Sequence, residues 1–148
     1  MSKNGFTLLE MMITVVIVGI LSTIAIRKYV DYTAHAQMSE TVVLAKNLAG
    51  EVLLNLQSGS CTSSTAKKNE QSGKYAKVWI SEGTVPWTET APKFPTNCYI
   101  SVAFLQGDAR VSKLLAGNSI GFSVLNNGDL QVSSYNGDLK KLIPKTLF

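Results

Sequence analysis

Metal-binding and catalytic side chains are scarce in this chain. Its 148 residues include one histidine, His35, and two cysteines, Cys61 and Cys98. A zinc site of the usual kind needs about four ligands from this set, so such a site is poorly supplied. A single histidine gives little support for a serine–histidine–aspartate set, and the chain has no phosphate-binding glycine loop. We therefore predict that the protein is not an enzyme and holds no metal or other cofactor.

The remaining polar candidates have ordinary structural interpretations. His35 falls inside a predicted helix and is expected to lie on its surface. Asp108, Asp129 and Asp138 stand singly in predicted turns, where aspartate is common because it hydrogen-bonds to nearby backbone. The net charge of +4 is too small to imply nucleic acid or an acidic partner by itself.

Charged residues are almost absent from one long segment near the N-terminus. Residues 6–26 read FTLLEMMITVVIVGILSTIAI, which is about the length that an α-helix needs to cross a bilayer. An ordinary signal peptide has its small-residue cleavage site after the apolar core. Here the small residue, Gly5, comes before that core, and no such site follows before Arg27. Cleavage at Gly5 would therefore leave the hydrophobic helix on the mature protein.

The orientation of this helix stays open by charge alone. Arg27 and Lys28 would be cytoplasmic by the positive-inside rule, whereas Lys3 argues weakly for the opposite orientation. A disulfide between Cys61 and Cys98 would belong to an oxidising compartment and favours a C-terminal domain outside the cytoplasm. Such a bond would stabilise the fold by about 3–4 kcal/mol in the loop-entropy model. Two free buried thiols are the alternative.

Glu10 is the only ionisable residue between positions 6 and 26. A carboxylate in apolar surroundings costs several kcal/mol unless it is paired or neutralised. One interpretation places Glu10 near the headgroups, where it reaches water. The other uses the α-amino group that cleavage would create on Phe6, one helical turn earlier, in the same chain or in a neighbouring copy. A buried pair of this kind would set the axial register between staggered copies.

The helical pattern continues beyond Arg27. Apolar residues recur every three or four positions, which predicts one buried face of a helix that reaches Ser58 and stops at Gly59. The predicted buried positions are Val30, Ala34, Met38, Val42, Ala45, Leu48, Val52 and Leu56.

The rest of the chain reads as strands and loops. Residues 60–74 are predicted to form a loop, and residues 81–97, with Pro86, Pro92 and Pro95, a long connection. The Asn127-Gly128 pair between the last two strands predicts a hairpin. We therefore expect an α+β fold, in which one long N-terminal helix packs on an antiparallel sheet of about four strands. The predicted strands are residues 75–80, 98–105, 119–125 and 130–135.

The string GFTLLE, followed by the apolar run, resembles the class III leader and N-terminal helix of type IV pilins. The resemblance covers roughly the first thirty-five residues, and Gly19, Tyr29 and Tyr32 also match the pattern of that family. It implies that a membrane peptidase cuts between Gly5 and Phe6 and methylates Phe6.

The same resemblance implies the role of further residues. Glu10 would act in subunit docking. Gly19, by the conformational freedom of glycine, is a weak spot at which the helix could loosen in a filament. In this chain Arg27 stands where many pilins have a proline, which would kink the helix. Many pilins also close a C-terminal loop with a disulfide, whereas the tail here, residues 142–148, has no cysteine. The Cys61–Cys98 bridge would instead lie near the loop after the helix, and packing of Leu142, Ile143, Leu147 and Phe148 would hold the tail.

The resemblance divides the chain into a leader, a membrane and filament-core helix, and a globular head. The expected segments are residues 1–5 for the leader, 6–27 for the core helix and 28–148 for the head. Within the head, we expect the amphipathic half of the helix at residues 28–58, the αβ-loop at 59–77, the sheet at 75–135 and the C-terminal region at 136–148.

The implied partners are those of a pilin. They are identical subunits in a helical homopolymer, the prepilin peptidase and N-methyltransferase, the bacterial inner membrane before assembly, and the pilus assembly platform. The surface filament would serve adhesion, twitching motility or DNA uptake. Two alternatives stay open: a pseudopilin of a type II secretion system, and a membrane-anchored binding domain that never polymerises.

DNA and a host surface are further candidate partners of the filament. Two groups of lysines could contact DNA phosphates, although solvated surface lysines are the ordinary interpretation. The first group is Lys67, Lys68, Lys74 and Lys77, and the second is Lys140, Lys141 and Lys145.

Overall fold

A computed structural model describes residues 6–82 and 95–148. The chain forms two compact units, the first ending at Thr33 and the second running from Ala34 to Phe148. The predicted leader, with Gly5, lies outside the described residues, as do Pro86 and Pro92 of the predicted connection.

One helix, α1 (Leu8–Leu56), runs through both units. It continues without a break at Gly19 and at Arg27, where the amide that a proline would lack is available for the helical hydrogen bonds. It ends two residues before the predicted Ser58, and Gly59 follows with a φ of +81°, a conformation that glycine adopts without strain.

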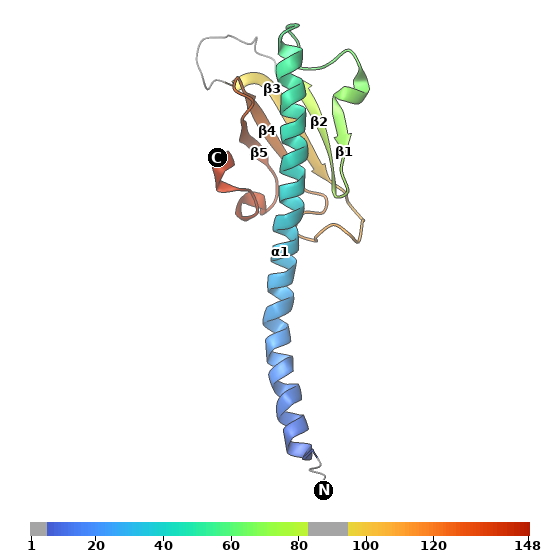
Figure 1. Ribbon diagram of the computed structural model, residues 1–148, viewed down its shortest axis with the longest axis vertical. Coiled ribbons are helices and arrows are strands. Elements are labelled where there is room, and N and C mark those ends of the chain that lie inside the picture. Colours follow the sequence, from blue (N-terminus) through green and yellow to red (C-terminus); the bar gives the residue numbers. More distant parts are fainter. Residues whose placement is uncertain (1–5, 83–94) are drawn as a thin grey trace, which may run out of the picture. The chain divides into compact units, whose positions relative to one another are not determined.

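Five antiparallel strands form one sheet in the order β1-β2-β3-β4-β5 (Figure 1). The strands are β1 (Glu70–Ser72), β2 (Ala76–Glu82), β3 (Pro95–Phe104), β4 (Ser119–Leu125) and β5 (Leu130–Tyr135). Asn127-Gly128 lies in the loop between β4 and β5, so the hairpin predicted from the sequence is confirmed.

Two parts of the sequence prediction need correction. The predicted loop at residues 60–74 contains a short 3₁₀ helix, η1 (Ala66–Lys68), and strand β1, so the sheet has five strands where about four were expected. Strand β1 has only three residues, all of them polar, so it lacks the apolar alternation by which a strand is predicted. Its pairing with the neighbouring strand β2, in which Ser72 lies opposite Lys77, is what makes it a strand. The predicted connection is also shorter, because Pro95 begins β3, a place where a proline is tolerated.

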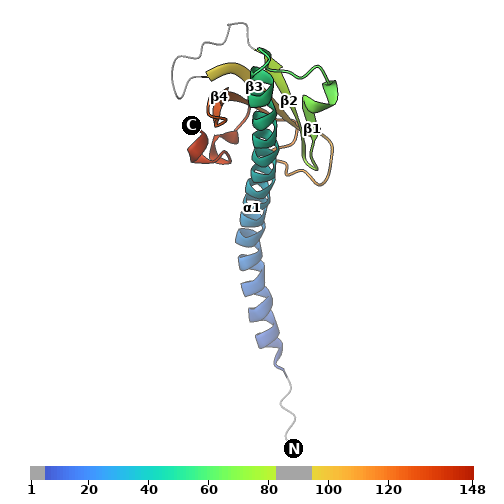
Figure 2. The ribbon, with the colours of Figure 1, turned by 45° about the horizontal axis from the view of Figure 1, so that its top comes forward.

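The second unit has its core between the sheet and the part of α1 from Ala34 onwards, which lies across one face of the sheet (Figure 2). Alternate residues of the strands and every third or fourth residue of the helix point into this core. Most of the predicted helix face is buried, except that Val30 is exposed and Leu56 only partly buried. The buried helix positions are Ala34, Gln37, Met38, Thr41, Val42, Ala45, Leu48, Ala49 and Val52.

Gln37 is a buried polar residue that the apolar pattern did not predict. Its Nε2 donates a hydrogen bond to the carbonyl oxygen of Arg110 (2.7 Å), and its Oε1 accepts one from the amide of Ser112 (2.8 Å). This side chain therefore satisfies two backbone groups of the β3–β4 loop and fastens that loop to the helix.

The C-terminal region packs on the β5 side of the sheet through two 3₁₀ turns, η2 (Leu139–Lys141) and η3 (Lys145–Leu147). As expected, Leu142, Ile143 and Leu147 are buried. Phe148 is 52% exposed, contrary to its predicted packing, and meets Tyr135 edge to face with ring centroids 6.4 Å apart.

Cys61 and Cys98 form a disulfide that joins the segment after the helix to β3. Beside it, Glu82 pairs in register with Cys98 across β2 and β3. One oxygen of Glu82, Oε1, accepts hydrogen bonds from the Ser60 hydroxyl (2.8 Å), the Thr62 hydroxyl (3.1 Å) and two backbone amides, those of Cys61 (3.1 Å) and Thr62 (3.2 Å). The disulfide and the Glu82 carboxylate together fasten residues 60–62 to the sheet.

Loss of the disulfide should destabilise the second unit. The bond closes a loop with a sequence separation of 37 residues, for which the chain-entropy model gives about 4 kcal/mol. We expect Cys61→Ser to lower the free energy of unfolding by about that amount in urea titrations of the detergent-solubilised chain. The Cys61→Ser/Cys98→Ser double variant is the control, because added reductant should leave its midpoint unchanged. An equal midpoint for the wild-type chain and Cys61→Ser would contradict the prediction.

Glu82 should make stability depend on pH. Hydrogen bonds from the side chains of Ser60 and Thr62 lower the pKa of its carboxyl below the ordinary 4.5. Because the folded-state pKa is the lower one, the stabilisation is complete above about pH 4.5 and is lost as the pH falls through the folded-state pKa. We expect the difference in unfolding midpoint between wild type and Glu82→Gln to be constant near neutral pH and to shrink in acid. Glu40→Gln, at an exposed helix position, is the matched control, and a pH-independent difference for Glu82→Gln would refute the assignment.

Candidate functional site

The N-terminal part of α1 carries a continuous apolar surface. Among the described residues, α1 contains a window long and apolar enough, by length and composition, to cross a membrane, and none of that window is buried. Large apolar surfaces of this kind mark contact with a membrane or with protein. The exposed large side chains are Phe6, Leu8, Leu9, Met11, Met12, Ile13, Val15, Val16, Ile17, Val18, Ile20, Leu21, Ile24 and Ile26.

Glu10 caps the beginning of this helix together with Thr7. Its Oε2 accepts hydrogen bonds from the backbone amide of Thr7 (3.0 Å) and from the Thr7 hydroxyl (2.8 Å). The amide of Glu10 in turn donates to the Thr7 hydroxyl (3.3 Å). Since α1 begins at Leu8, Thr7 is the N-cap and Glu10 the third helical residue, which is the geometry of a capping box.

The capping box gives Glu10 a local role that the sequence analysis did not assign. The signal was present, because threonine followed three residues later by glutamate is the pattern of such a box. The structure also places the carboxylate at the end of the helix where backbone amides are free, and a negative charge is favourable there. Its other oxygen, Oε1, has no hydrogen bond among the described residues, so it remains available to a further donor.

The other predicted residues of this segment are on the surface. A Cβ built on Gly19 would meet no atom within 4 Å, so nothing within the chain requires glycine there. Tyr29 and Tyr32 are 69% and 75% exposed. A contact with another molecule would account for these features, and none within the described chain does.

The second unit offers little for catalysis. His35 is exposed, as predicted, and the described residues contain no cluster of His, Cys, Asp and Glu that could hold a metal ion. Asp108 accepts hydrogen bonds from the Arg110 guanidinium and amide, which lower the pKa of its carboxyl to about 2. Asp129 is paired with the amide side chain of Asn127 (2.7 Å). These carboxylates organise the loops in which they occur.

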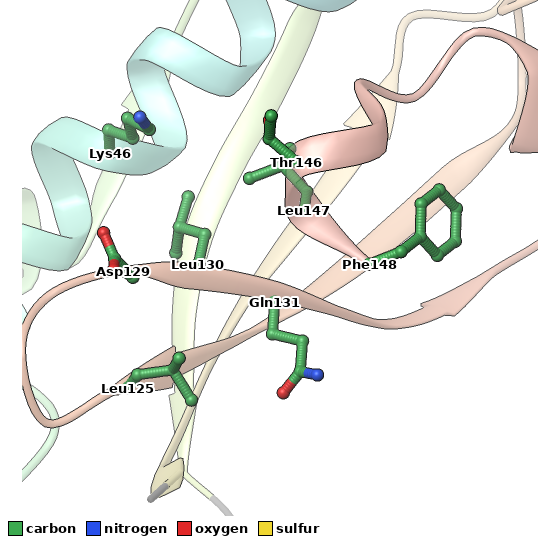
Figure 3. A pocket seen from close by; sticks show the side chains of 8 residues that line it. All are labelled: Lys46, Leu125, Asp129, Leu130, Gln131, Thr146, Leu147 and Phe148. Atoms are coloured by element: carbon green, nitrogen blue, oxygen red, sulfur yellow. The ribbon is translucent and has the colours of Figure 1, made fainter. Parts of the chain in front are cut away.

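One surface hollow of about 420 Å³ lies beside the β4–β5 hairpin (Figure 3). Its lining residues come from α1, the hairpin, η3 and the last residue of the chain, and they include one lysine and one aspartate. No convergent set of polar groups in it suggests a reaction. The lining residues are Lys46, Leu125, Asp129, Leu130, Gln131, Thr146, Leu147 and Phe148.

Comparison with known proteins agrees with the importance of the N-terminal segment. The family model described as "Prokaryotic N-terminal methylation motif" matches residues 1–26. This match covers the predicted leader, the cap and the whole apolar run.

Relatives align over nearly the entire chain. A fimbrial protein of Dichelobacter nodosus is 36% identical over 153 residues, which cover 98% of this chain and 95% of that protein. The type IV major fimbrial protein FimA of Dichelobacter nodosus strain VCS1703A is 39% identical over 155 residues, which cover 98% of this chain and 94% of that protein. These relatives are structural proteins by name, in keeping with the prediction that the chain is not an enzyme. The exposed apolar part of α1, the cap at the start of that helix and the α+β head all accompany this similarity. The chain therefore belongs to the type IV fimbrial protein (pilin) family.

Proposed function

We propose that the chain is a precursor that is cut between Gly5 and Phe6, methylated on Phe6 and then assembled through α1 into a surface filament. Before assembly the apolar part of α1 lies in the inner membrane. In the filament the same surface packs against identical subunits. The prepilin peptidase and the assembly platform are the partners that this route requires.

The exposed apolar surface of residues 6–26 is the observation that carries this proposal. A bilayer and a bundle of identical helices both cover such a surface without water. Because Phe6 directly precedes Thr7, cleavage would place the new amino group next to the capping box that holds Glu10. The free Oε1 of Glu10 could then accept a hydrogen bond from this amine in the same subunit, or from the amine of a neighbouring subunit in the filament.

The pseudopilin alternative is less well supported. The relatives that align over 98% of the chain are named as fimbrial proteins, which favours the subunit of a surface filament over a pseudopilin of a secretion system.

Adhesion, twitching motility and DNA uptake would all use such a filament. DNA would meet the lysines separately, since Lys67 and Lys68 precede edge strand β1 whereas Lys140 and Lys141 follow the opposite edge strand, β5.

Mass spectrometry of filaments sheared from cells tests the processing step. The intact subunit should lack residues 1–5 and carry one additional methyl group on Phe6. Cells that lack the prepilin peptidase provide the control, in which the full-length chain should stay in the membrane fraction. Filaments built from a full-length, unmethylated chain would exclude this route.

Three variants separate the two roles of Glu10. Glu10→Gln keeps an oxygen acceptor for the capping box but loses the negative charge, whereas Glu10→Ala loses both. Thr7→Ala weakens the cap, at a cost of about 1 kcal/mol in helix stability, and keeps the charge. If the charge pairs with an amine during assembly, Glu10→Gln and Glu10→Ala should both yield few filaments, and Thr7→Ala should assemble nearly normally. The measurement is the amount of subunit in sheared filaments relative to the amount in the membrane.

The outcome against this role is equally specific. If Glu10→Gln assembles as well as wild type and Thr7→Ala as poorly as Glu10→Ala, then Glu10 acts only as a helix cap. Equal membrane levels of the three variants are the necessary control, because they show that insertion and folding are unaffected.

A further inference from the structure

Two exposed asparagines of the second unit are each followed by glycine. Asn127-Gly128 lies in the loop between β4 and β5, and Asn136-Gly137 follows β5 directly. In such a pair the backbone nitrogen of the glycine can attack the side-chain amide carbon of the asparagine, because glycine has no Cβ that would hinder the approach. The two pairs share this chemistry but differ in their hydrogen bonds.

At Asn136 the side-chain carbonyl is polarised and the nucleophile is free. Asn136 Oδ1 accepts a hydrogen bond from the backbone amide of Ser119 (2.5 Å), while the amide of Asn136 donates to the Ser119 carbonyl (3.1 Å). A donor on Oδ1 stabilises the negative charge that this oxygen acquires when the amide carbon is attacked. The backbone nitrogen of Gly137 has no hydrogen-bond partner among the described residues.

At Asn127 the carbonyl has a similar donor, but the nucleophile is occupied. Asn127 Oδ1 accepts a hydrogen bond from the amide of Asp129 (3.0 Å). The amide of Gly128, however, donates to the carbonyl oxygen of Leu125 (2.9 Å) inside the turn. The leaving nitrogen, Nδ2, is also held by the Asp129 carboxylate (2.7 Å). Attack at Asn127 therefore requires the turn to open first.

We propose that Asn136 is a site of spontaneous deamidation and that Asn127 is protected from it by the hairpin. The nitrogen of Gly137 bonds to Cγ of Asn136 and loses its proton, and the side-chain nitrogen leaves as ammonia, which yields a five-membered succinimide. One water molecule then opens this ring at either carbonyl. The products are aspartate and isoaspartate at position 136.

The reactive pair is built into the fold because the glycine is required. Gly137 has a φ of +64°, which side chains rarely adopt, and a Cβ there would lie 2.7 Å from Oδ1 of Asn118. Replacing Gly137 would therefore strain the backbone and crowd Asn118. Either product adds one negative charge and lowers the formal net charge of the chain from +4 to +3. Isoaspartate also lengthens the main chain by one methylene, at the residue whose amide bonds to Ser119.

The experiment compares the two asparagines within one sample. The folded, detergent-solubilised full-length chain is incubated in mildly alkaline buffer, and conversion at each site is followed by peptide mass mapping and by enzymatic methyl labelling of isoaspartate. Breaking one hydrogen bond before attack should slow Asn127, so Asn136 is expected to convert roughly fivefold faster or more. Equal rates, or faster conversion at Asn127, would overturn the proposal.

A denatured sample and a matched variant complete the test. In concentrated urea the turn is lost, and the ratio of the two rates should fall towards one; an unchanged ratio would show that the fold does not control the reaction, against the proposal. Asn136→Gln should abolish conversion at position 136, because its longer side chain would need a six-membered ring, and should leave the rate at Asn127 unchanged. Isoaspartate signal that persists undiminished in the peptide spanning position 136 of this variant would contradict the assignment to Asn136.

Discussion

The exposed apolar surface of residues 6–26 is the constraint on which the other features depend. Fourteen large apolar side chains lie there in the open. At about 1.5–3 kcal/mol for each, covering them is worth on the order of 20–40 kcal/mol. A typical domain is stable by only about 5–15 kcal/mol, so this surface cannot stay in water. A membrane and a filament core are two environments that cover it. In the proposed route the subunit moves from the membrane into the filament.

Glu10 shows how a charged residue can belong to such a segment. The capping box gives its Oε2 two hydrogen bonds from Thr7, so the carboxylate is already satisfied in part within its own chain. The cost of carrying a charge among apolar groups is thereby reduced before any second subunit arrives. Helix capping and pairing with the amine of Phe6 are compatible, because the cap leaves Oε1 without a partner among the described residues. The cap also holds the carboxylate beside the position at which cleavage would create that amine.

The second unit has a buried core of its own, which the sheet forms with the face of α1 from Ala34 onwards. Outside its core, three polar or covalent links fix segments that have few apolar residues. Gln37 holds the β3–β4 loop, the disulfide holds Cys61 to β3, and Glu82 holds the backbone around Thr62. Each of these links joins residues far apart in the sequence. A chain exposed on a filament would benefit from such links, because loops without a core otherwise open at low cost.

The sequence by itself determined the long helix, its apolar half, the hairpin at Asn127-Gly128 and the residues of the N-terminal motif. These features depend on local composition and spacing, which periodicity and turn chemistry report directly. Only the tertiary structure decided which distant residues meet. The bonds of Gln37 to the β3–β4 loop and those of Glu82 to residues 60–62 require contacts across long stretches of chain. Strand β1 was missed for another reason, because its three polar residues carry no apolar alternation. The tertiary structure also decided the different environments of Asn127 and Asn136. Both are followed by glycine, but whether the amide of that glycine donates a hydrogen bond depends on how the turn folds.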